Sequence, residues 1–446
     1  MDAAVLAGII MLITCVFFLI LGIPIAISIG FGSFLAMLCV LNFDRAMITS
    51  AQQMFRGSDN FPLMAITFFI LAGNIMNNGG IAIRLVNCAK VLAGRMPAPL
   101  AQTNIIANML FGALSGSGVA AAAAIGGTLG PIERKEGYEP NFVAAVNTAS
   151  APTGMLIPPS NTLIVYSTVA TGTSVAALFL AGYLPGILWG LFCMVLVAII
   201  AKRQNIPKAA RTNFRTSVST IVIAIPSLLL IVIVIGGILG GIFTATEASA
   251  IAVCYSIILS LIYRNLNLPL MKKILIETAE TTVIVTFMIG ASMIMSYVMV
   301  YTHIPTLITN TILGFTSQPY FILLIMNCLL LVIGCAMDPI PAILIFTPIF
   351  LPICKSFGMD PVHFGIMITM NLCIGTITPP VGPILFTGVR IGGVTIESIF
   401  KPMLPFFAIT VFTLLITTYI PAISMWLPKL TGLVGNYSHI FRVVGI

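Results

Sequence analysis

The chain has 446 residues, of which 59% are hydrophobic and only 7% are charged, and its mean hydropathy is +1.13. Because a soluble protein carries about 25% charged residues, this composition excludes a water-soluble body and indicates a polytopic membrane protein. The net charge of +8 comes from basic residues in short loops, which favours topology signals over a nucleic-acid surface, so we expect no nucleic-acid partner.

Ten apolar stretches are long enough to be membrane-spanning helices. They are residues 5–21, 23–41, 62–78, 141–170, 178–200, 218–239, 246–262, 278–300, 362–391 and 403–425. Apolar runs of this length favour helices over the roughly ten-residue alternating strands of an outer-membrane barrel, so the predicted fold class is all-α, with the lipid bilayer around it. The first stretch lacks a basic n-region and continues into a second one, so we interpret it as a retained span.

Two further apolar stretches, residues 98–130 and 319–353, are interrupted near their middle. The interruptions are LSGSG at 114–118 and AMDPIP at 336–341. Each stretch is too broken for a single span, and irregular backbone at membrane depth must be buried in protein or line a cavity. We therefore predict two re-entrant helical hairpins, each with a tight tip.

Basic residues predict which loops face the cytoplasm. Segment 201–215 contains five basic residues and no acidic one, the loops around Lys90 and Arg264 are also basic, and loop 42–60 is balanced. Because positive charge marks the cytoplasmic side, alternation of the spans places the N-terminus outside and segment 201–215 inside.

An ungapped shift of 221 residues aligns segment 131–174 with segment 352–395. The matched residues are mostly those that dictate backbone geometry: Pro131, Gly137, Pro140, Gly154, Pro158, Pro159 and Gly172 against Pro352, Gly358, Pro361, Gly375, Pro379, Pro380 and Gly393. By the charge argument the two segments face opposite sides. We therefore predict two inverted-topology repeats, 1–216 and 217–446, each with scaffold helices, a hairpin and a Gly/Pro-broken helix (141–170 and 362–391).

Paired broken spans in inverted halves point to a transport site, whereas the alternative is an old duplication kept for packing. The breaks contain GMLIPPSNT at 154–162 and GTITPPVGP at 375–383, where adjacent prolines remove amide donors and free carbonyl groups. Unwound carbonyls of this kind coordinate sodium in transporters. We predict two sodium sites, formed by Ser115, Ser117, Gly154, Ile157 and Pro159 and by Asp338, Gly375, Thr378 and Pro380.

The half-helix N-termini at the breaks offer partial positive charge to an anion. We predict that an organic anion binds between the breaks, at Ser160, Asn161, Thr162, Gly382 and Arg390. Because Val381, Gly382 and Pro383 occupy the positions that match Ser160, Asn161 and Thr162, the polar groups are asymmetric. Such asymmetry favours a sugar acid, with one carboxylate and a hydroxylated body, over a symmetric dicarboxylate.

Several of these residues have a structural alternative. Ser115 and Ser117 could simply allow helices to approach closely, and Ser160, Asn161 and Thr162 could bond the broken backbone. In the same way the double prolines could be passive kinks.

Four other polar residues also leave two interpretations open. Asp338 could cap a hairpin helix, and Arg390, near the cytoplasmic end of its span, could only extend toward the interface. Glu247 in FTATEASA lies at the start of a span, where a structural partner is expected. Asn74, followed by NNGG at 77–80, could border the site or end a helix.

Six stretches resemble the large membrane subunit of tripartite ATP-independent periplasmic (TRAP) transporters, a likeness that extends over nearly the whole chain. They are FFILAGNIMNNGG (68–80), ALSGSGVAAAAAIG (113–126), GMLIPPSNTLIVYS (154–167), GIFTATEASA (241–250), MDPIPAILIFTPIFLPI (337–353) and GTITPPVGPILF (375–386). The segments IPPSNTLIVYS and AALFLAGYLPGIL look most like the sialic-acid branch of that family.

The resemblance implies an elevator-type transporter of the bacterial inner membrane, with a periplasmic N-terminus, that imports an organic acid anion with two or more sodium ions. It implies two protein partners, a periplasmic substrate-binding protein and a small four-helix membrane subunit. Because the sequence begins directly at the first span of the large subunit, we expect that small subunit to be a separate chain. Sialic acid or a related sugar acid is the expected substrate, and a C4-dicarboxylate is the alternative.

Two other classes of protein fit the sequence less well than a transporter does. An intramembrane enzyme needs a nucleophile with a base, but no histidine lies near either hairpin, so we expect no catalytic residues. A proton-translocating subunit needs acids or lysines within several spans, and these are nearly absent. The sequence also contains no CxxC, HExxH or GxxxxGK[ST] motif, so no redox, zinc or nucleotide cofactor is expected.

Overall fold

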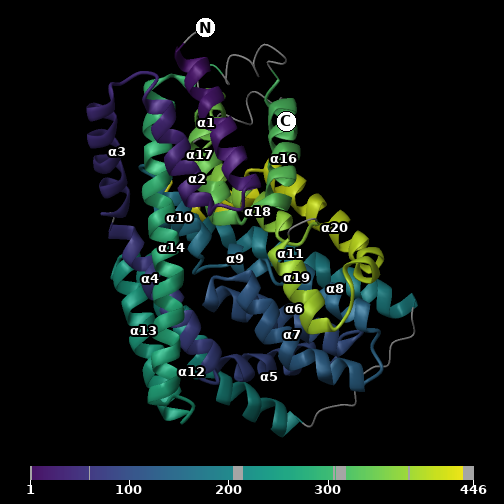
Figure 1. Cartoon of the computed structure of the whole chain (residues 1–446). Helices are drawn as coiled ribbons and strands as arrows, with labels where there is room; N and C mark the ends of the chain where they lie inside the picture. The colour runs from purple at the N-terminus through teal and green to yellow at the C-terminus, as the bar shows by residue number, and fades with distance from the viewer. Residues whose placement is uncertain are drawn as a thin grey trace.

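The computed structural model describes residues 3–59, 61–203, 214–304, 307, 318–379 and 382–434. Within these ranges the regular elements are all α-helices and no strand occurs (Figure 1). Among the described helices, eight are long and apolar enough to cross a membrane. The prediction of an all-α polytopic membrane protein is therefore confirmed.

One group of helices forms the scaffold, which includes the long helices on the left of Figure 1. It comprises α1 (Ala3–Ile20), α2 (Ile25–Met37), α3 (Phe43–Ser58), α4 (Phe61–Asn78), α5 (Ile81–Ala93), α12 (Phe214–Leu239), α13 (Ala245–Ile262) and α14 (Leu268–Tyr301). Helices α4 and α13 pack side by side, and α14 packs on α2, α3 and α4. The predicted repeat boundary after residue 216 lies in the first turn of α12.

Helices α3 and α5 correct the expectation that their segments are loops. Asn42 caps α3, because its Oδ1 accepts a hydrogen bond of 3.2 Å from the Arg45 amide. Both helices combine apolar and charged residues in one amphipathic pattern, so neither contains the long apolar run that marks a span. The turn between α4 and α5 is closed by Gly80, whose φ of 78° suits a residue without a Cβ.

The two predicted hairpins are present as helix–turn–helix units. The first consists of α6 (Pro99–Ser115) and α7 (Gly118–Lys135), and the second of α16 (Pro319–Ala336) and α17 (Pro339–Ser356). The second arms end later than expected, because the prolines inside α7 and α17 do not terminate them. The tips lie at 116–117 and 337–338, which is where the sequence interruptions place them.

Both broken spans are also present. The first is divided into α8 (Pro140–Ser150), α9 (Thr153–Leu156) and α10 (Asn161–Val169), and the second into α18 (Pro361–Gly375) and α19 (Pro383–Gly392). They lie in the interior with α11 (Val175–Arg203), α20 (Ile396–Tyr419) and α21 (Ala422–Leu430) packed outside them. The Tyr166 hydroxyl on α10 donates a hydrogen bond of 2.6 Å to the carbonyl of Pro361, so the two broken spans contact each other.

Candidate functional site

A cavity of about 450 Å³ lies between the hairpin tips, the two breaks and the scaffold. It is lined from α2, α4, α6, α7, α9, α10, α14, α17 and α19 and from the connections that join the half-helices. Five residues predicted from sequence line it: Ser115, Ser117, Asn161, Thr162 and Asp338. The hairpins and breaks therefore meet in space, although they are far apart along the chain.

Four helices begin at this cavity. The residues that line it include Gly118 at the start of α7, Asn161 at the start of α10, Ile340 in the first turn of α17 and Pro383 at the start of α19. At α7 and α10 the amides of the first two residues donate no hydrogen bond to a described residue, whereas the first-turn amides of α17 and α19 are absent at prolines or already paired. Each helix start carries roughly half a positive charge, so the four ends together, and the free amides of α7 and α10 above all, favour an anion.

The first hairpin and the first break touch backbone to backbone. A Cβ atom added to Gly154 would overlap the Cα of Gly112, so only glycine fits at this crossing. At the tip, the Ser115 hydroxyl is 3.5 Å from the carbonyl of Gly112 and 3.4 Å from that of Ser117. Because both distances are long, the Ser115 oxygen retains capacity for a ligand. Ser117 caps α7 and accepts a hydrogen bond of 3.3 Å from the Ala120 amide.

The first break leaves carbonyl groups unpaired. No described residue donates a hydrogen bond to the carbonyls of Ile157, Pro158 or Pro159. The side chains of Ile157 and Pro159 pack elsewhere, Ile157 against Gly186 and Pro159 in an apolar cluster beside α4. These two residues can therefore contribute only backbone oxygens to an ion, as the sequence prediction requires of them.

The three polar residues that follow the first break divide into two roles. Ser160 and Thr162 donate hydrogen bonds to the carbonyl of Met155, the latter over 3.0 Å, and so they bond the broken backbone. Asn161 makes no side-chain hydrogen bond with any described residue, and its buried Oδ1 is unpaired. Of the three, Asn161 is therefore the side chain that remains available to a ligand.

The second hairpin and break repeat the backbone contact with different chemistry. A Cβ added to Gly375 would overlap the backbone of Gly334. Asp338 caps α17 by accepting a hydrogen bond of 3.2 Å from the Ile340 amide, and it is the one charged side chain among the described residues that line the cavity. Both roles considered from sequence, capping and ion binding, are thus geometrically open to the same carboxylate.

The remaining predicted residues lie at or beyond the edge of the site. Gly382 precedes α19 and Thr378 donates a hydrogen bond of 2.8 Å to the Ile374 carbonyl, so both belong to the second break. Arg390 is exposed in the last turn of α19 and is not among the cavity-lining residues. Pro380 lies outside the described residues. Glu247 completes a capping box with Thr244, which confirms its structural role.

The scaffold supplies a whole wall of the cavity that the sequence pattern did not single out, apart from Asn74. The wall consists of Ile25, Ile70, Gly73, Asn74, Thr281, Ile284, Val285 and Met288. At Gly73, α4 lies directly against the hairpin tip, because an added Cβ would be 3.1 Å from both the Cα and the carbonyl oxygen of Ser115. No signal marks the α14 residues, since Ile284, Val285 and Met288 belong to a continuous apolar run and Thr281 lies at its polar edge.

A second buried feature absent from the sequence predictions is a polar network inside the first hairpin. The Asn108 amide donates to Asn104 (2.9 Å) and Ser150 (2.9 Å), and the Asn104 amide lies 3.5 Å from both carboxylate oxygens of the fully buried Glu133. Since these residues belong to α6, α7 and α8, the network joins the hairpin to the first half of the broken span.

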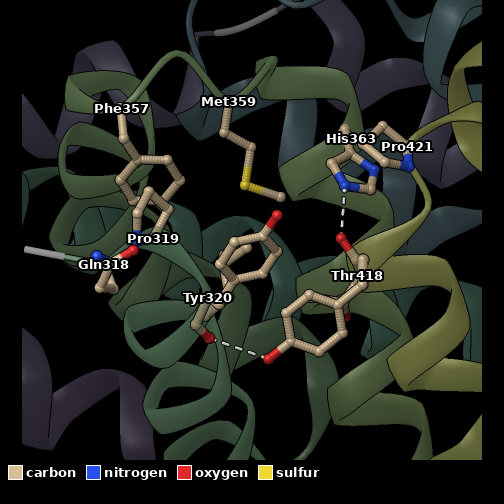
Figure 2. A pocket seen from close by; sticks show the side chains of 10 residues that line it. Gln318, Pro319, Tyr320, Phe357, Met359, His363, Thr418 and Pro421 are labelled. Atoms are coloured by element: carbon tan, nitrogen blue, oxygen red, sulfur yellow. Dashed lines mark hydrogen bonds between the residues drawn. The ribbon is translucent and has the colours of Figure 1, made fainter. Parts of the chain in front are cut away.

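A smaller cavity of about 50 Å³ lies apart from the main one, at the starts of α16 and α18 (Figure 2). Its polar centre is His363, whose Nε2 is 3.1 Å from the carbonyl of Thr418 and whose Nδ1 is 2.6 Å from the hydroxyl of Ser424. Both ring nitrogens are thus paired within the protein. We interpret His363 as a core histidine that links α18 to α20 and α21.

The sequence is similar to proteins of known class over almost its entire length. A model of the family described as "Tripartite ATP-independent periplasmic transporter, DctM component" matches residues 12–423. The Salmonella typhimurium protein YgiK is 52% identical over 412 residues, covering 92% of this chain and 95% of that protein. The sialic acid TRAP transporter large permease protein SiaM of Vibrio cholerae is 35% identical, covering 92% and 95%.

Another relative is longer than this chain. The isethionate TRAP transporter permease protein DctMQ of Oleidesulfovibrio alaskensis is 39% identical over 92% of this chain and 64% of its own length. Among solved structures, the Alcanivorax borkumensis YdaH transporter superposes with a TM-score of 0.64 at 13% identity, covering 87% of this chain and 90% of that one, which is a likeness of fold alone. On the matches to the family model and to these permeases, the chain belongs to the large permease (DctM) proteins of tripartite ATP-independent periplasmic transporters, and it is a transporter rather than an enzyme.

Proposed function

We propose that this chain forms the translocation pathway of a sodium-coupled importer for an organic acid anion, with sialic acid or a related sugar acid as the substrate. The observation that carries the proposal is the convergence of four helix N-termini on a cavity whose one charged lining residue, within the described part of the chain, is Asp338. The N-termini attract the anion, and the carboxylate with the unpaired carbonyls attracts a cation.

Coupling follows from electrostatics. An organic anion and the Asp338 carboxylate repel each other inside one cavity, and a sodium ion beside the carboxylate removes that repulsion. The first ion is assigned to Ser115, Ser117 and the backbone of the first break, and the second to Asp338 and the backbone of the second break. Binding of the ions and of the anion is then mutually favourable, which is the thermodynamic requirement for symport.

The proposal includes two inverted repeats and an elevator movement, in which the hairpins and breaks move against the scaffold. The matching glycine contacts of the two hairpin–break pairs support it. In this arrangement the N-terminus is periplasmic and the basic segment 201–215 is cytoplasmic. Large permeases of this family work with a periplasmic binding protein and usually with a small membrane subunit. We assign the small subunit to a separate chain, although the DctMQ relative has a longer permease chain.

The substrate assignment rests on the unequal polarity of the two breaks. The first offers Asn161 and Thr162 to the cavity, whereas the second offers Thr376 and the start of α19. A ligand with one carboxylate and a hydroxylated body matches this asymmetry better than a symmetric C4-dicarboxylate, which is the alternative. The names of the relatives agree with organic anions in general, since they include sialic acid, isethionate and C4-dicarboxylates.

The deciding experiment measures uptake into proteoliposomes that contain this chain and its small subunit, with the binding protein outside. We expect radiolabelled sialic acid to accumulate when a sodium gradient is imposed, and not when a proton gradient replaces it. Omission of the binding protein should abolish uptake. Uptake that follows the proton gradient and ignores sodium would overturn the coupling, and accumulation of succinate in place of sialic acid would select the alternative substrate.

A further inference from the structure

The two sides of the main cavity offer opposite kinds of polar group. The side formed by the hairpins and breaks offers helix N-termini, and those of α7 and α10 have free amide donors. The scaffold side is apolar except for Asn74 on α4 and Thr281 on α14. What these two side chains can donate or accept is fixed by their other contacts.

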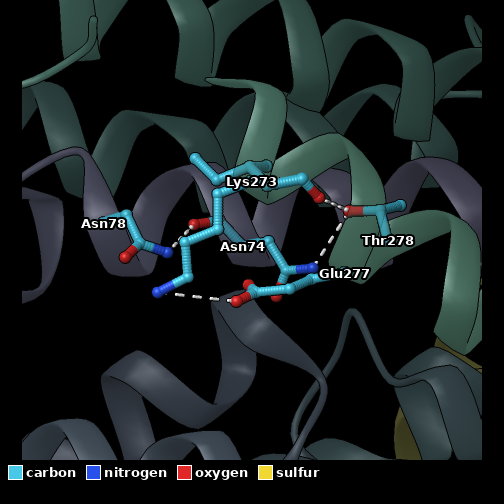
Figure 3. Close-up of polar contacts among 6 residues, drawn as sticks. Asn74, Asn78, Lys273, Glu277 and Thr278 are labelled. Carbon is cyan, nitrogen blue, oxygen red and sulfur yellow. Dashed lines mark hydrogen bonds and ion pairs between the residues drawn. The ribbon is translucent and has the colours of Figure 1, made fainter. Parts of the chain in front are cut away.

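The orientation of the Asn74 amide follows from its neighbour on α14 (Figure 3). The Thr278 hydroxyl donates its proton over 2.7 Å to the carbonyl of Ile274, so its oxygen can only accept from Asn74. The Nδ2 of Asn74 lies 3.0 Å from that oxygen and is the donor. The amide is therefore held with its nitrogen toward Thr278, and no described residue donates to the Asn74 Oδ1 oxygen, which remains an acceptor on a cavity-lining residue.

Thr281 has the same character. Its hydroxyl donates over 2.9 Å to the carbonyl of Glu277, one turn earlier in α14. The neighbouring ion pair between Lys273 and Glu277, 3.7 Å long, keeps the nearby positive charge engaged (Figure 3). Because the Thr281 proton and one of the two Asn74 amide hydrogens are already used, the scaffold wall presents mainly acceptors and hydrocarbon to whatever fills the cavity.

We propose that Asn74 is a specificity-determining residue, whose Oδ1 accepts a hydrogen bond from a hydroxyl group of the bound anion. The inference rests on the proposed function and narrows its substrate class. A hydroxylated acid can turn its carboxylate to the helix N-termini and a hydroxyl to Asn74, so both of these groups are paired. A second carboxylate at this place would meet the Asn74 acceptor and hydrocarbon, with one amide hydrogen of Asn74 as its single donor on this wall, so its desolvation would be poorly compensated.

The test measures binding to the purified complex of this chain with its small membrane subunit, by calorimetry, with and without sodium. The probes are N-acetylneuraminate and D-gluconate, which carry one carboxylate and several hydroxyls, and succinate and fumarate, which carry two carboxylates and no hydroxyl. We expect the unaltered complex to bind at least one hydroxylated probe about tenfold or more tightly than either dicarboxylate, in sodium. Asn74→Leu should weaken the hydroxylated probe about tenfold and leave dicarboxylate binding unchanged.

The matched control is Thr278→Ser, which keeps the hydroxyl that holds the Asn74 nitrogen and so leaves the Asn74 Oδ1 in place. Its thermal stability and its preference for the hydroxylated probe should match those of the unaltered complex. Loss of the preference in both variants, or its retention in Asn74→Leu, would overturn the role of Asn74. Dicarboxylates that bind the unaltered complex as tightly as hydroxylated acids would also overturn it. If sodium promotes the binding of none of the four probes, the proposed function itself fails.

Discussion

The two hairpin–break pairs share a backbone contact and differ in side-chain chemistry. In both, a glycine of the first hairpin arm meets a glycine at the break, Gly112 with Gly154 and Gly334 with Gly375. The residue that caps the second arm is the neutral Ser117 in one pair and the charged Asp338 in the other. The comparison teaches that one backbone arrangement supports two chemically distinct halves of a site.

Removal of the shared contact should have the largest effect. We expect Gly154→Ala and Gly375→Ala each to abolish uptake, because the added methyl group would overlap backbone atoms that cannot rotate away. Overpacking of this kind costs about 1–3 kcal/mol or more. Thermal unfolding of the purified complex and proteoliposome uptake are the measurements.

Gly127→Ala on α7, where an added Cβ meets nothing within 4 Å, is the matched control and should behave like the unaltered protein. Loss of function from one of the two substitutions alone would break the equivalence.

The first half of the site should be sensitive to Asn161. Asn161→Ala removes an amide that has no partner in the described protein, so folding and assembly should be unaffected. Loss of a hydrogen bond to a charged ligand costs roughly 1.5–3 kcal/mol, which corresponds to a ten- to 150-fold weaker affinity. Uptake measured over a full range of substrate concentrations gives the affinity of the variant. If the curve of Asn161→Ala equals that of the unaltered protein, the anion binds elsewhere.

The second half of the site, which contains Asp338, should instead determine the affinity for sodium. In Asp338→Asn the side-chain oxygen can still cap α17, so the hairpin is retained while the charge is lost. We expect the sodium concentration for half-maximal uptake to rise about tenfold, equivalent to about 1.4 kcal/mol. Ser117→Ala, measured alongside, should raise the sodium concentration for half-maximal uptake by less, because this substitution removes no charge. A larger shift for Ser117→Ala would contradict the assignment of charge to the second half.

The smallest effect is expected outside both halves. Glu247→Ala removes a carboxylate that accepts hydrogen bonds from the Thr244 amide (2.7 Å) and hydroxyl (2.9 Å) at the start of α13. Loss of a helix cap typically costs about 1 kcal/mol, which lowers the melting temperature of a protein this large by only about a degree or two. Sodium and substrate titrations should be unchanged. A changed sodium titration would place Glu247 in the coupling machinery.

The fold and much of the site could be predicted because glycine, proline and apolar runs act locally. LSGSG and AMDPIP mark the hairpin tips, and the double prolines mark the breaks, since each dictates backbone geometry where it stands. Five residues selected on this basis line the cavity. The same logic applies to Ile157 and Pro159, whose predicted role rests on their carbonyls and not on their side chains.

The remainder depends on packing that no single segment encodes. Thr281, Ile284 and Val285 line the cavity only because α14 lies beside α4, and their sequence is that of any apolar helix. Helix α3 was missed because an amphipathic helix lacks a long apolar run. The contact of Glu133 with Asn104 joins residues of two hairpin arms that face each other only after the hairpin folds.

At Gly73, α4 has no side chain where it meets the backbone of Ser115, so the hairpin tip and the helix approach as closely as two chains can. A shift of one helical turn, about 5.4 Å, in either direction along α4 would bring Ser115 opposite Ile70 or Asn77, whose side chains stand out from the helix. Every shifted arrangement must therefore increase the separation of the two elements. A larger residue at this position would raise the energy of the arrangement described here relative to all the others, and would thereby change their populations without touching the ligand.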